Sequence, residues 1–215
     1  DMTMALILAV PRRLAEGEHL MRSGDWRGWS PTGMLGHRIF GKRLGIVGMG
    51  QIGQMVARKA SGCDMKILYT KRTRLSAAEE IAIGSAEYRG IEDLFMESDF
   101  ILLTPLLTKE TKGLVGERLI SMMKPSAILV NTSRGPVLDE VALEKALREK
   151  RIRGAALDVY QTEVPEPNPG PIEGLKSLPN VVLTPHMGSA ARETREEMAL
   201  YAVKNIELFL ARERP

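Results

Sequence analysis

The sequence predicts an α/β domain built on a doubly wound parallel sheet, and three observations support this fold class. Short apolar runs alternate with helical patterns along most of the chain. These runs are continuous rather than interrupted by polar residues, which is typical of strands buried on both faces of a parallel sheet. A glycine-rich turn joins one of the runs to a helical pattern. Strands and helices that alternate in this way form doubly wound sheets.

The predicted elements follow in chain order. Residues 1–22 have helical apolar spacing, with a bend expected at Pro11, and SGDWRGWSPTGMLG at 23–36 is a loop rich in Gly, Ser and Pro. The predicted strands are 44–47, 65–69, 100–103, 127–130, 154–157 and 181–183. The predicted helices between them are 51–60, 91–96 and 140–150. VPEPNPGP at 164–171 is expected to be a rigid extended loop.

The last segment, 190–211, is predicted to be a packing helix at the C-terminus. Its apolar side chains fall on one helical stripe, formed by Met198, Ala202, Ile206, Phe209 and Leu210.

Composition excludes several classes of protein. The 215 residues are 44% hydrophobic and 27% charged, which suits one globular domain. The net charge of +3 comes from scattered basic residues and does not indicate nucleic-acid binding. The opening run MTMALILAV is too short to span a membrane. The single cysteine, Cys63, cannot form an internal disulfide, which favours a reducing, cytoplasmic compartment, and no Cys/His set has the spacing of metal ligands.

A glycine fingerprint, G-x-G-x-x-G, lies between the apolar run LGIV and a helical pattern. We expect Gly48 to permit a tight turn and Gly50 to let the backbone approach a pyrophosphate. Gly53 allows the helix to pack close to the strand. The amides of Gln51 and Ile52 lie at the helix start, where the helix dipole favours an anion. This context predicts a dinucleotide site, whereas a glycine turn without a ligand is the less favoured alternative.

The next strand is followed by Thr70, Lys71, Arg72, Thr73 and Arg74, with no carboxylate between positions 65 and 78. NAD-binding domains usually carry an acidic residue here that accepts hydrogen bonds from the ribose 2′-hydroxyl. Cations and hydroxyls instead suit a 2′-phosphate. The stretch therefore predicts a preference for NADP(H), with NAD(H) as the alternative if the stretch is only a solvated basic loop.

Polar side chains follow several predicted strands at the edge that the fingerprint faces. In open α/β sheets, ligands bind outside the carboxyl ends of the strands. These polar residues and their neighbours are Thr104, Pro105, Asn131, Thr132, Ser133, Arg134, Asp158, Glu163, Thr184, Pro185 and His186.

One Arg, two acids and one His at this edge suit reversible hydride transfer to a carbonyl. His186 can give a proton to the developing alkoxide, and a neighbouring carboxylate stabilises its imidazolium form near neutral pH. Arg134 can hold a carboxylate and polarise an adjacent keto group. The simpler alternatives are a surface histidine and a structural ion pair.

Four stretches resemble the D-isomer-specific 2-hydroxyacid dehydrogenases: GKRLGIVGMGQIGQMVA, VNTSRGPVLDEVALEKAL, GAALDVYQTEVP and LTPHMGSAARETR. They occur in the family's order and extend over nearly the whole chain. SGDWRGWSPTGMLG and LYTKRT are similar to the glyoxylate and hydroxypyruvate reductase branch. The resemblance implies a Rossmann-like cofactor-binding domain over 1–215 and NADPH-dependent reduction of a small 2-oxo acid.

The resemblance also implies a role for individual residues. Arg134 would bind the substrate's carboxylate and keto oxygen, His186 would donate the proton, and Glu163 would pair with His186. Asp158 would contact the nicotinamide carboxamide. The residues expected to line the cofactor are Gly48, Gly50, Gln51, Ile52, Gly53, Thr70, Lys71, Arg72, Thr73, Thr104, Pro105, Thr132, Ser133, Arg134, Asp158, His186, Met187 and Gly188.

Members of this family have a further N-terminal substrate domain of about 100 residues, an ordinary domain size, and the resemblance implies that this domain lies outside the given sequence. They are typically homodimers formed through the cofactor domain, so helix 1–22 is expected to belong to the interdomain hinge or the dimer interface. With half of the cleft missing, we expect the chain to bind cofactor but to turn over little substrate.

Two positions depart from the family pattern. Pro105 lies one position earlier than the family's usual proline, and Leu106 stands in its place. Val164 separates Glu163 from Pro165, where the family usually has Glu-Pro directly.

The sequence is also compatible with other functions. One is an NAD-dependent dehydrogenase of the same family, including those acting on formate or phosphoglycerate. The formate enzymes usually have Gln where Glu163 stands, and the phosphoglycerate enzymes usually carry an acid where Thr70 and Lys71 stand. Another is a dinucleotide-sensing interaction protein, as in the family's corepressor members.

Overall fold

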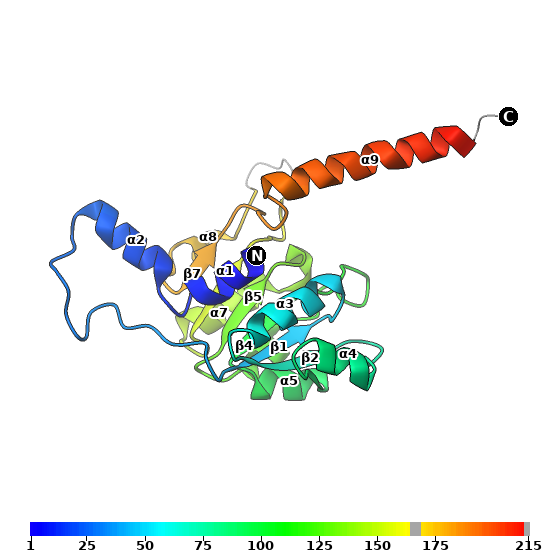
Figure 1. Ribbon diagram of the computed structural model, residues 1–215. Helices are drawn as coiled ribbons and strands as arrows, with labels where there is room; N and C mark the ends of the chain where they lie inside the picture. The colour runs from blue at the N-terminus through cyan, green and yellow to red at the C-terminus, as the bar shows by residue number, and fades with distance from the viewer. Residues whose placement is uncertain (164–168, 213–215) are drawn as a thin grey trace.

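Seven parallel strands form a single sheet in the order β3-β2-β1-β4-β5-β6-β7 (Figure 1). The computed structural model describes residues 1–163 and 169–212. The strands are β1 (Arg43–Val47), β2 (Lys66–Thr70), β3 (Glu87–Tyr88), β4 (Phe100–Leu103), β5 (Ile128–Asn131), β6 (Gly154–Leu157) and β7 (Val181–Leu183). The predicted doubly wound sheet is therefore confirmed, and every predicted strand is present to within one residue at each end.

The helices between the strands include those predicted and several that were not. The predicted ones are α3 (Gln51–Ser61), α5 (Ile91–Glu97) and α7 (Glu140–Arg148). The additional ones are α4 (Ala77–Ala82), α6 (Glu117–Ser121), η1 (Gly135–Val137) and α8 (Glu173–Lys176). Each additional helix is at most two turns long, so it is too short to show a helical apolar period.

The core lies on both faces of the sheet, because alternate side chains of each strand point to opposite faces. Phe100 and Leu102 pack with side chains of α1 and α3 on one face. Ile101 and Leu103 pack with side chains of α5, α6 and α7 on the other. Each of these four side chains is almost completely buried. Covered faces leave the ends of the strands as the place where polar side chains can gather.

The predicted N-terminal helix 1–22 is two helices, α1 (Met2–Ala9) and α2 (Leu14–Ser23). Arg13 separates them in the left-handed backbone region, with φ 52°. Pro11 lies in the break, where it has no N–H to donate to a preceding turn. The prediction of a single bent helix is therefore wrong, since the helix ends at Ala9 and a second one begins at Leu14.

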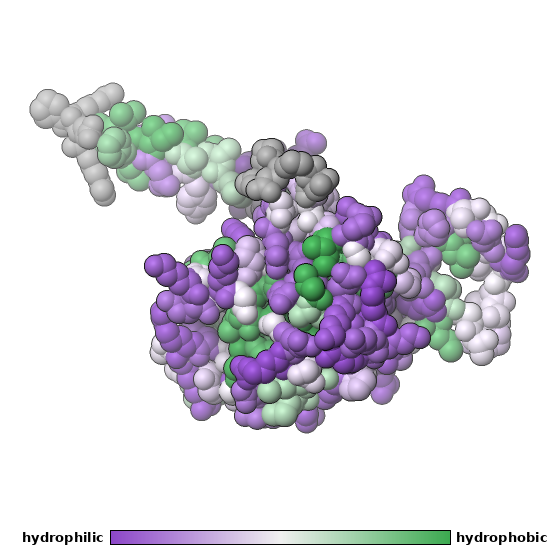
Figure 2. All heavy atoms as spheres, turned by 180° about the vertical axis from the view of Figure 1, so that it is seen from behind, coloured by the Kyte–Doolittle hydropathy of each residue, from purple (hydrophilic) through white to green (hydrophobic). Residues whose placement is uncertain are grey.

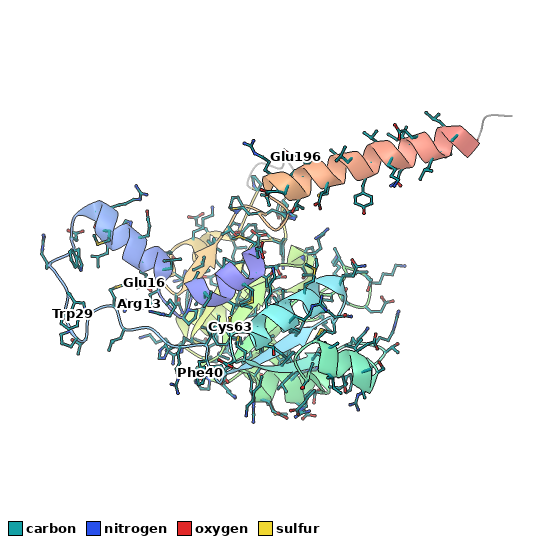
Figure 3. The ribbon with its side chains drawn as sticks, in the orientation of Figure 1. Arg13, Glu16, Trp29, Phe40, Cys63 and Glu196 are labelled. Carbon is teal, nitrogen blue, oxygen red and sulfur yellow. The ribbon has the colours of Figure 1, made fainter. Side chains whose placement is uncertain are left out.

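The second of these helices and the loop after it form an arm that projects from the domain (Figure 1). No residue of α2 is buried, and residues 24–38 are exposed. Trp29, which is 83% exposed, lies on this arm well away from the sheet (Figure 3). We refer to residues 14–38 as the arm.

The C-terminal helix α9 (Arg192–Arg212) extends away from the domain rather than packing on it (Figure 1). The helix was predicted, but its predicted packing is wrong, because the described residues 192–211 are all exposed. Further apolar side chains lie off the predicted stripe, among them Leu200, Tyr201 and Val203. Apolar residues therefore surround the helix instead of forming one seam, and Figure 2 shows them on a helix remote from the body.

In the predicted extended loop 164–171, residues 164–168 lie outside the described residues, and with them the Val164 and Pro165 departure. Over the part of the chain that the structure describes, none of the helices is long and apolar enough to cross a membrane.

The close contact between β1 and α5 yields a stability prediction. A Cβ at Gly45 would lie 2.2 Å from Ser98 Oγ and 2.7 Å from Leu94 Cδ2. We expect Gly45→Ala to lower the free energy of unfolding by about 1–3 kcal/mol, as overpacking does. The measurement is the urea midpoint. Gly17→Ala is the control, because its Cβ comes no nearer than 3.7 Å, to Met34 Cε, and it should not destabilise the protein.

Candidate active site

The glycine fingerprint forms a tight turn between β1 and α3. Gly48 has φ 95°, a backbone conformation that residues with a side chain rarely adopt. Its amide donates to Thr70 O at 2.9 Å. Thr104 Oγ1 donates to Gly48 O at 2.6 Å from the end of β4. Since the strand order reverses between β1 and β4, this turn lies at the topological switch point of the sheet.

The other two glycines of the fingerprint differ in what surrounds them. A Cβ at Gly53 would lie 2.6 Å from Gly48 O, so packing of the helix against the turn requires glycine there. A Cβ at Gly50 would meet no atom within 4 Å, and Gly50 has an ordinary extended backbone with φ −83°. Nothing in the described protein requires glycine at position 50, and the space in front of it is open.

The start of α3 leaves its first amides without helical partners. Gln54 N makes the first helical bond, to Gly50 O at 2.9 Å. The amides of Gln51 and Ile52 come before it, and both residues are exposed. Unpaired amides at a helix start are a favourable place for an anion.

The basic stretch follows β2, the neighbour of β1, so it lies beside the fingerprint turn. Arg74 is held by Glu80, with Nε 2.9 Å from Oε1. Lys71 and Arg72 form no ion pair with any of the described residues, and Arg72 and Thr73 are exposed. Lys71 is half-buried and Arg72 is exposed, so two cations without an ion pair among the described residues lie at the end of the strand next to the fingerprint strand.

The loop after β5 is built around the buried Asn131. Its Oδ1 accepts hydrogen bonds from Ser133 N (3.0 Å) and Ser133 Oγ (2.8 Å), and its Nδ2 donates to Arg134 O at 3.2 Å. This side chain fixes the backbone that carries Arg134, whose guanidinium is exposed and donates to Ser133 O at 2.7 Å. Thr132 instead contacts α1, through its Oγ1 and that of Thr3 at 3.1 Å.

The loop of Arg134 meets the segment after β6 backbone to backbone. A Cβ at Gly135 would lie 1.8 Å from the carbonyl carbon and oxygen of Tyr160. Glycine is therefore required at position 135, and it brings Arg134 close to the segment that carries Glu163.

Asp158 directly follows β6 and holds the segment that contains His186. Its carboxylate is 1% exposed, and Oδ1 accepts from Thr184 Oγ1 (2.5 Å) and Met187 N (2.8 Å). Oδ2 accepts from Gly188 N at 2.8 Å. His186 between these contacts has φ 53°, a strained conformation for a non-glycine residue that the surrounding bonds maintain.

His186 and Glu163 form a pair at this edge. His186 Nδ1 lies 2.9 Å from Glu163 Oε2, and the two side chains are 48% and 28% exposed. Glu163 Oε1 accepts from Tyr160 N at 2.8 Å, which fixes the carboxylate. With Nδ1 bound to a carboxylate, Nε2 of the imidazole is directed away from the pair and is available for proton transfer.

Tyr160 connects these loops. Its buried hydroxyl donates to Thr184 O at 2.8 Å, and burial raises the pKa of this phenol to about 12. Its backbone contacts Gly135 and holds Glu163, so one residue links the segments of all three predicted catalytic side chains. The phenol stays protonated at physiological pH and acts as a donor to the backbone.

The structure places the predicted site residues along one edge of the sheet, with His186 and Glu163 in direct contact. Sequence reasoning placed Asn131 and Thr184 at this edge, as polar residues next to strand ends, but gave them no role in holding it together. It missed three other residues that hold the edge together, which are Thr3, Glu140 and Tyr160. In the described ranges, no group of three or more His, Cys, Asp or Glu side chains could hold a metal ion. A cavity of about 560 Å³ lies at the opposite edge and is lined by Pro125, Leu147, Arg148, Lys150, Ile152, Arg153, Leu178, Pro179 and Asn180.

Several known proteins are similar to this chain in sequence and in fold. The family model for the D-isomer specific 2-hydroxyacid dehydrogenase, NAD binding domain, matches residues 4–188. Glyoxylate reductase from Thermococcus litoralis is 51% identical over 219 aligned residues. That match covers 100% of this chain and 64% of the relative, so the chain spans less than two thirds of the relative's length.

Two solved structures agree with this match. The TT0316 protein from Thermus thermophilus superposes with a TM-score of 0.90 at 43% identity, covering 100% of this chain and 65% of that one. An acyclic imino acid reductase (Bsp5), solved with NADPH and D-Arg, has a TM-score of 0.83 at 34% identity, covering 99% and 64%. Together these similarities show that the chain belongs to the D-isomer specific 2-hydroxyacid dehydrogenase family, as the NAD binding domain.

Proposed function

We propose that this chain is the cofactor-binding domain of an NADPH-dependent reductase that converts a small 2-oxo acid, of the glyoxylate or hydroxypyruvate type, to the 2-hydroxy acid. The observation that supports it most is the His186–Glu163 pair, 2.9 Å apart at the edge that also holds the fingerprint turn. The similarity to glyoxylate reductases supports the substrate class.

The residues around the fingerprint fit a dinucleotide. The open space at Gly50 and the free amides of Gln51 and Ile52 suit a pyrophosphate, which needs close backbone approach and hydrogen-bond donors. When bound, the cofactor supplies the hydride for the carbonyl carbon. Thr104, Pro105, Thr132 and the segment 186–188 lie at the ends of strands on the same edge and complete the proposed lining.

The preference for NADPH rests on the basic stretch. Lys71 and Arg72 lack ion pairs within the described structure and lie one strand away from the fingerprint. A 2′-phosphate next to them would gain charge-assisted hydrogen bonds, whereas NADH would leave both cations unpaired. The solved relative that holds NADPH is consistent with this choice.

The geometry of the pair and of the two loops beside it supports the proposed catalytic roles. His186 gives a proton from Nε2 to the carbonyl oxygen as the hydride reaches the carbon, and Glu163 keeps the imidazole oriented through Nδ1. The exposed guanidinium of Arg134 binds the carboxylate and polarises the keto oxygen. Asp158 holds the His186 segment, and its Oδ2, which accepts a hydrogen bond from Gly188 N, is the proposed acceptor for the nicotinamide carboxamide.

The rest of the cleft is expected outside this chain. The match covers 64% of the Thermococcus litoralis relative, so about a third of that protein lies outside it, and the family resemblance assigns a substrate domain to that part. We propose that α9, with apolar residues on all sides, packs against this domain, which also supplies the remaining substrate contacts. Cys63 as a free thiol fits a cytoplasmic setting.

A homodimer through the cofactor domain is also part of the proposal. The arm exposes Leu14, Met21, Trp26, Trp29 and Leu35, a set of apolar side chains that the body of the domain does not cover. Exposed aromatic residues of this kind are typical of interfaces. A second copy of the chain would bury them.

Cofactor preference gives the first functional prediction. This chain should bind NADPH at least tenfold more tightly than NADH, a difference of about 1.4 kcal/mol, and Arg72→Asp should abolish the preference. Titration followed by cofactor fluorescence or calorimetry measures it. Lys66→Asp makes the same charge change at the other end of β2 and should leave the preference intact. Equal or tighter binding of NADH would favour an NAD-dependent dehydrogenase of the same family.

The open space at Gly50 gives a second prediction. Gly50→Ser keeps a good helix N-cap and meets no protein atom, so the urea midpoint should not change. Binding of both dinucleotides should weaken by about tenfold or more, or 1.4 kcal/mol, because the side chain occupies the pyrophosphate position. Unchanged dinucleotide binding would argue against the proposed phosphate site.

Turnover tests the proposal that a further domain completes the cleft. With saturating NADPH and glyoxylate, this chain should be slower than the Thermococcus litoralis glyoxylate reductase by about 100-fold or more, since a poorly held substrate loses orientation. The assay follows NADPH oxidation for both proteins at one temperature. A comparable kcat in the two proteins would show that the chain needs no further domain.

The exposed arm predicts the assembly state. Light scattering at micromolar concentration should give the mass of a dimer, and Trp29→Ala should raise the dimer Kd by about tenfold or more. Ile81→Ala removes another exposed apolar side chain, on α4, and should leave Kd unchanged. A monomer for the unaltered chain would contradict the dimer proposal.

A further inference from the structure

Glu140 is a buried carboxylate for which the proposed chemistry has no use. It is the first residue of α7 and is 1% exposed. Among the described residues it has no cationic partner, and burial raises the pKa of its carboxyl group. Burying a carboxylate without a cation is unfavourable unless hydrogen bonds compensate for the lost water. Its contacts therefore need an explanation.

The two oxygens of Glu140 hold two separate stretches of backbone. Oε1 accepts from Gln161 N at 2.7 Å, and Oε2 accepts from Ile172 N at 3.3 Å. Between these positions, Gly170 N donates to Thr162 O at 2.7 Å, which forms an antiparallel bridge. One carboxylate thus joins both limbs of the stem of a loop at its base.

Glu163 lies on this stem, two residues beyond the amide that Glu140 holds. Tyr160 N, the neighbouring amide, donates to Glu163 Oε1 at 2.8 Å. The Gln161 side chain adds a second restraint, since Nε2 donates to Leu138 O at 2.9 Å in the turn before α7. The position of the Glu163 carboxylate relative to His186 thus depends on where this backbone is fixed.

We propose that Glu140 is a positioning residue that clamps both limbs of the loop stem and thereby sets the orientation of Glu163 toward His186. The inference rests on the proposed function, in which the pair of Glu163 and His186 orients the proton donor. Two carboxylate oxygens are required because two amides must be accepted. An amide side chain can accept one of them and would place an NH2 group against the other.

The test uses Glu140→Gln in this chain, with Glu149→Gln as the matched control at the other end of α7. Glu149 is exposed and pairs with Arg151 at 2.8 Å, so it has no part in the loop stem. Amide hydrogen exchange of Gln161 and Ile172 measures the clamp. Nitrogen NMR of the imidazoles measures the pair, and His19 and His37, the other two histidines of the chain, serve as internal references.

In Glu140→Gln we expect at least one of the two amides to exchange about tenfold faster or more, as the loss of a buried hydrogen bond implies. We also expect the Nδ1–H tautomer of His186, which donates to Glu163, to become less populated while His19 and His37 do not change. Glu149→Gln should alter neither readout. If amide exchange became faster while the His186 tautomer population did not change, Glu140 would have only a structural role and the proposal would be overturned.

A measurement on the unaltered chain covers the case in which Glu140→Gln does not fold. Gln161 and Ile172 amides held by Glu140 should exchange as slowly as the amides of β6, and rapid exchange would overturn the proposal. Neither readout depends on turnover or bound cofactor. Failure of the clamp is therefore distinguishable from failure of the proposed reductase function, which would show only in cofactor titration and turnover.

Discussion

A parallel sheet covered on both faces is the constraint on which the rest of this molecule depends. Side chains such as Ile101 and Leu102 are buried on opposite faces, so polar groups can emerge only where strands end. All six strand pairings are parallel, so these ends meet at one edge. The fingerprint turn, the Arg134 loop and the His186 segment therefore share an edge even though they are far apart in sequence.

Buried acids and close glycine contacts hold the loops of that edge together. Asp158 and Glu140 are each 1% exposed, and both accept hydrogen bonds from backbone amides. Gly135 lets two loops meet at the backbone of Tyr160. Such contacts order loops before any ligand arrives, which is how a protein keeps donors and acceptors in position for a reaction. The strained backbone of His186 is a local consequence of this order.

Apolar surface is distributed unevenly over the molecule. The body buries most of its large aliphatic side chains, with exceptions such as Ile81 and Leu106. The arm and α9 instead expose many apolar side chains, among them Trp29, Leu35, Tyr201 and Phe209, and Figure 2 shows apolar residues along the projecting C-terminal helix. Large exposed apolar patches usually mark surfaces that meet another protein or domain. The two projecting elements are therefore the surfaces proposed for assembly, whereas the edge of the sheet is the proposed site of the chemistry.

The sequence by itself determined the strands, the longer helices of the sheet and the fingerprint turn, because each rests on local spacing or on the properties of glycine. It also made Arg134, Glu163 and His186 the candidate catalytic residues, since each lies shortly after a strand. It did not reveal β3 or the short helix α4, whose few residues show no period. The predicted packing of α9 on the domain was wrong, because an apolar pattern does not show which surface is available to cover it. Only the tertiary structure showed the roles of Glu140 and Tyr160, since their partners at Ile172 and Thr184 are distant in sequence. Contacts of that kind arise when folding brings the ends of different strands together, and no local pattern encodes them.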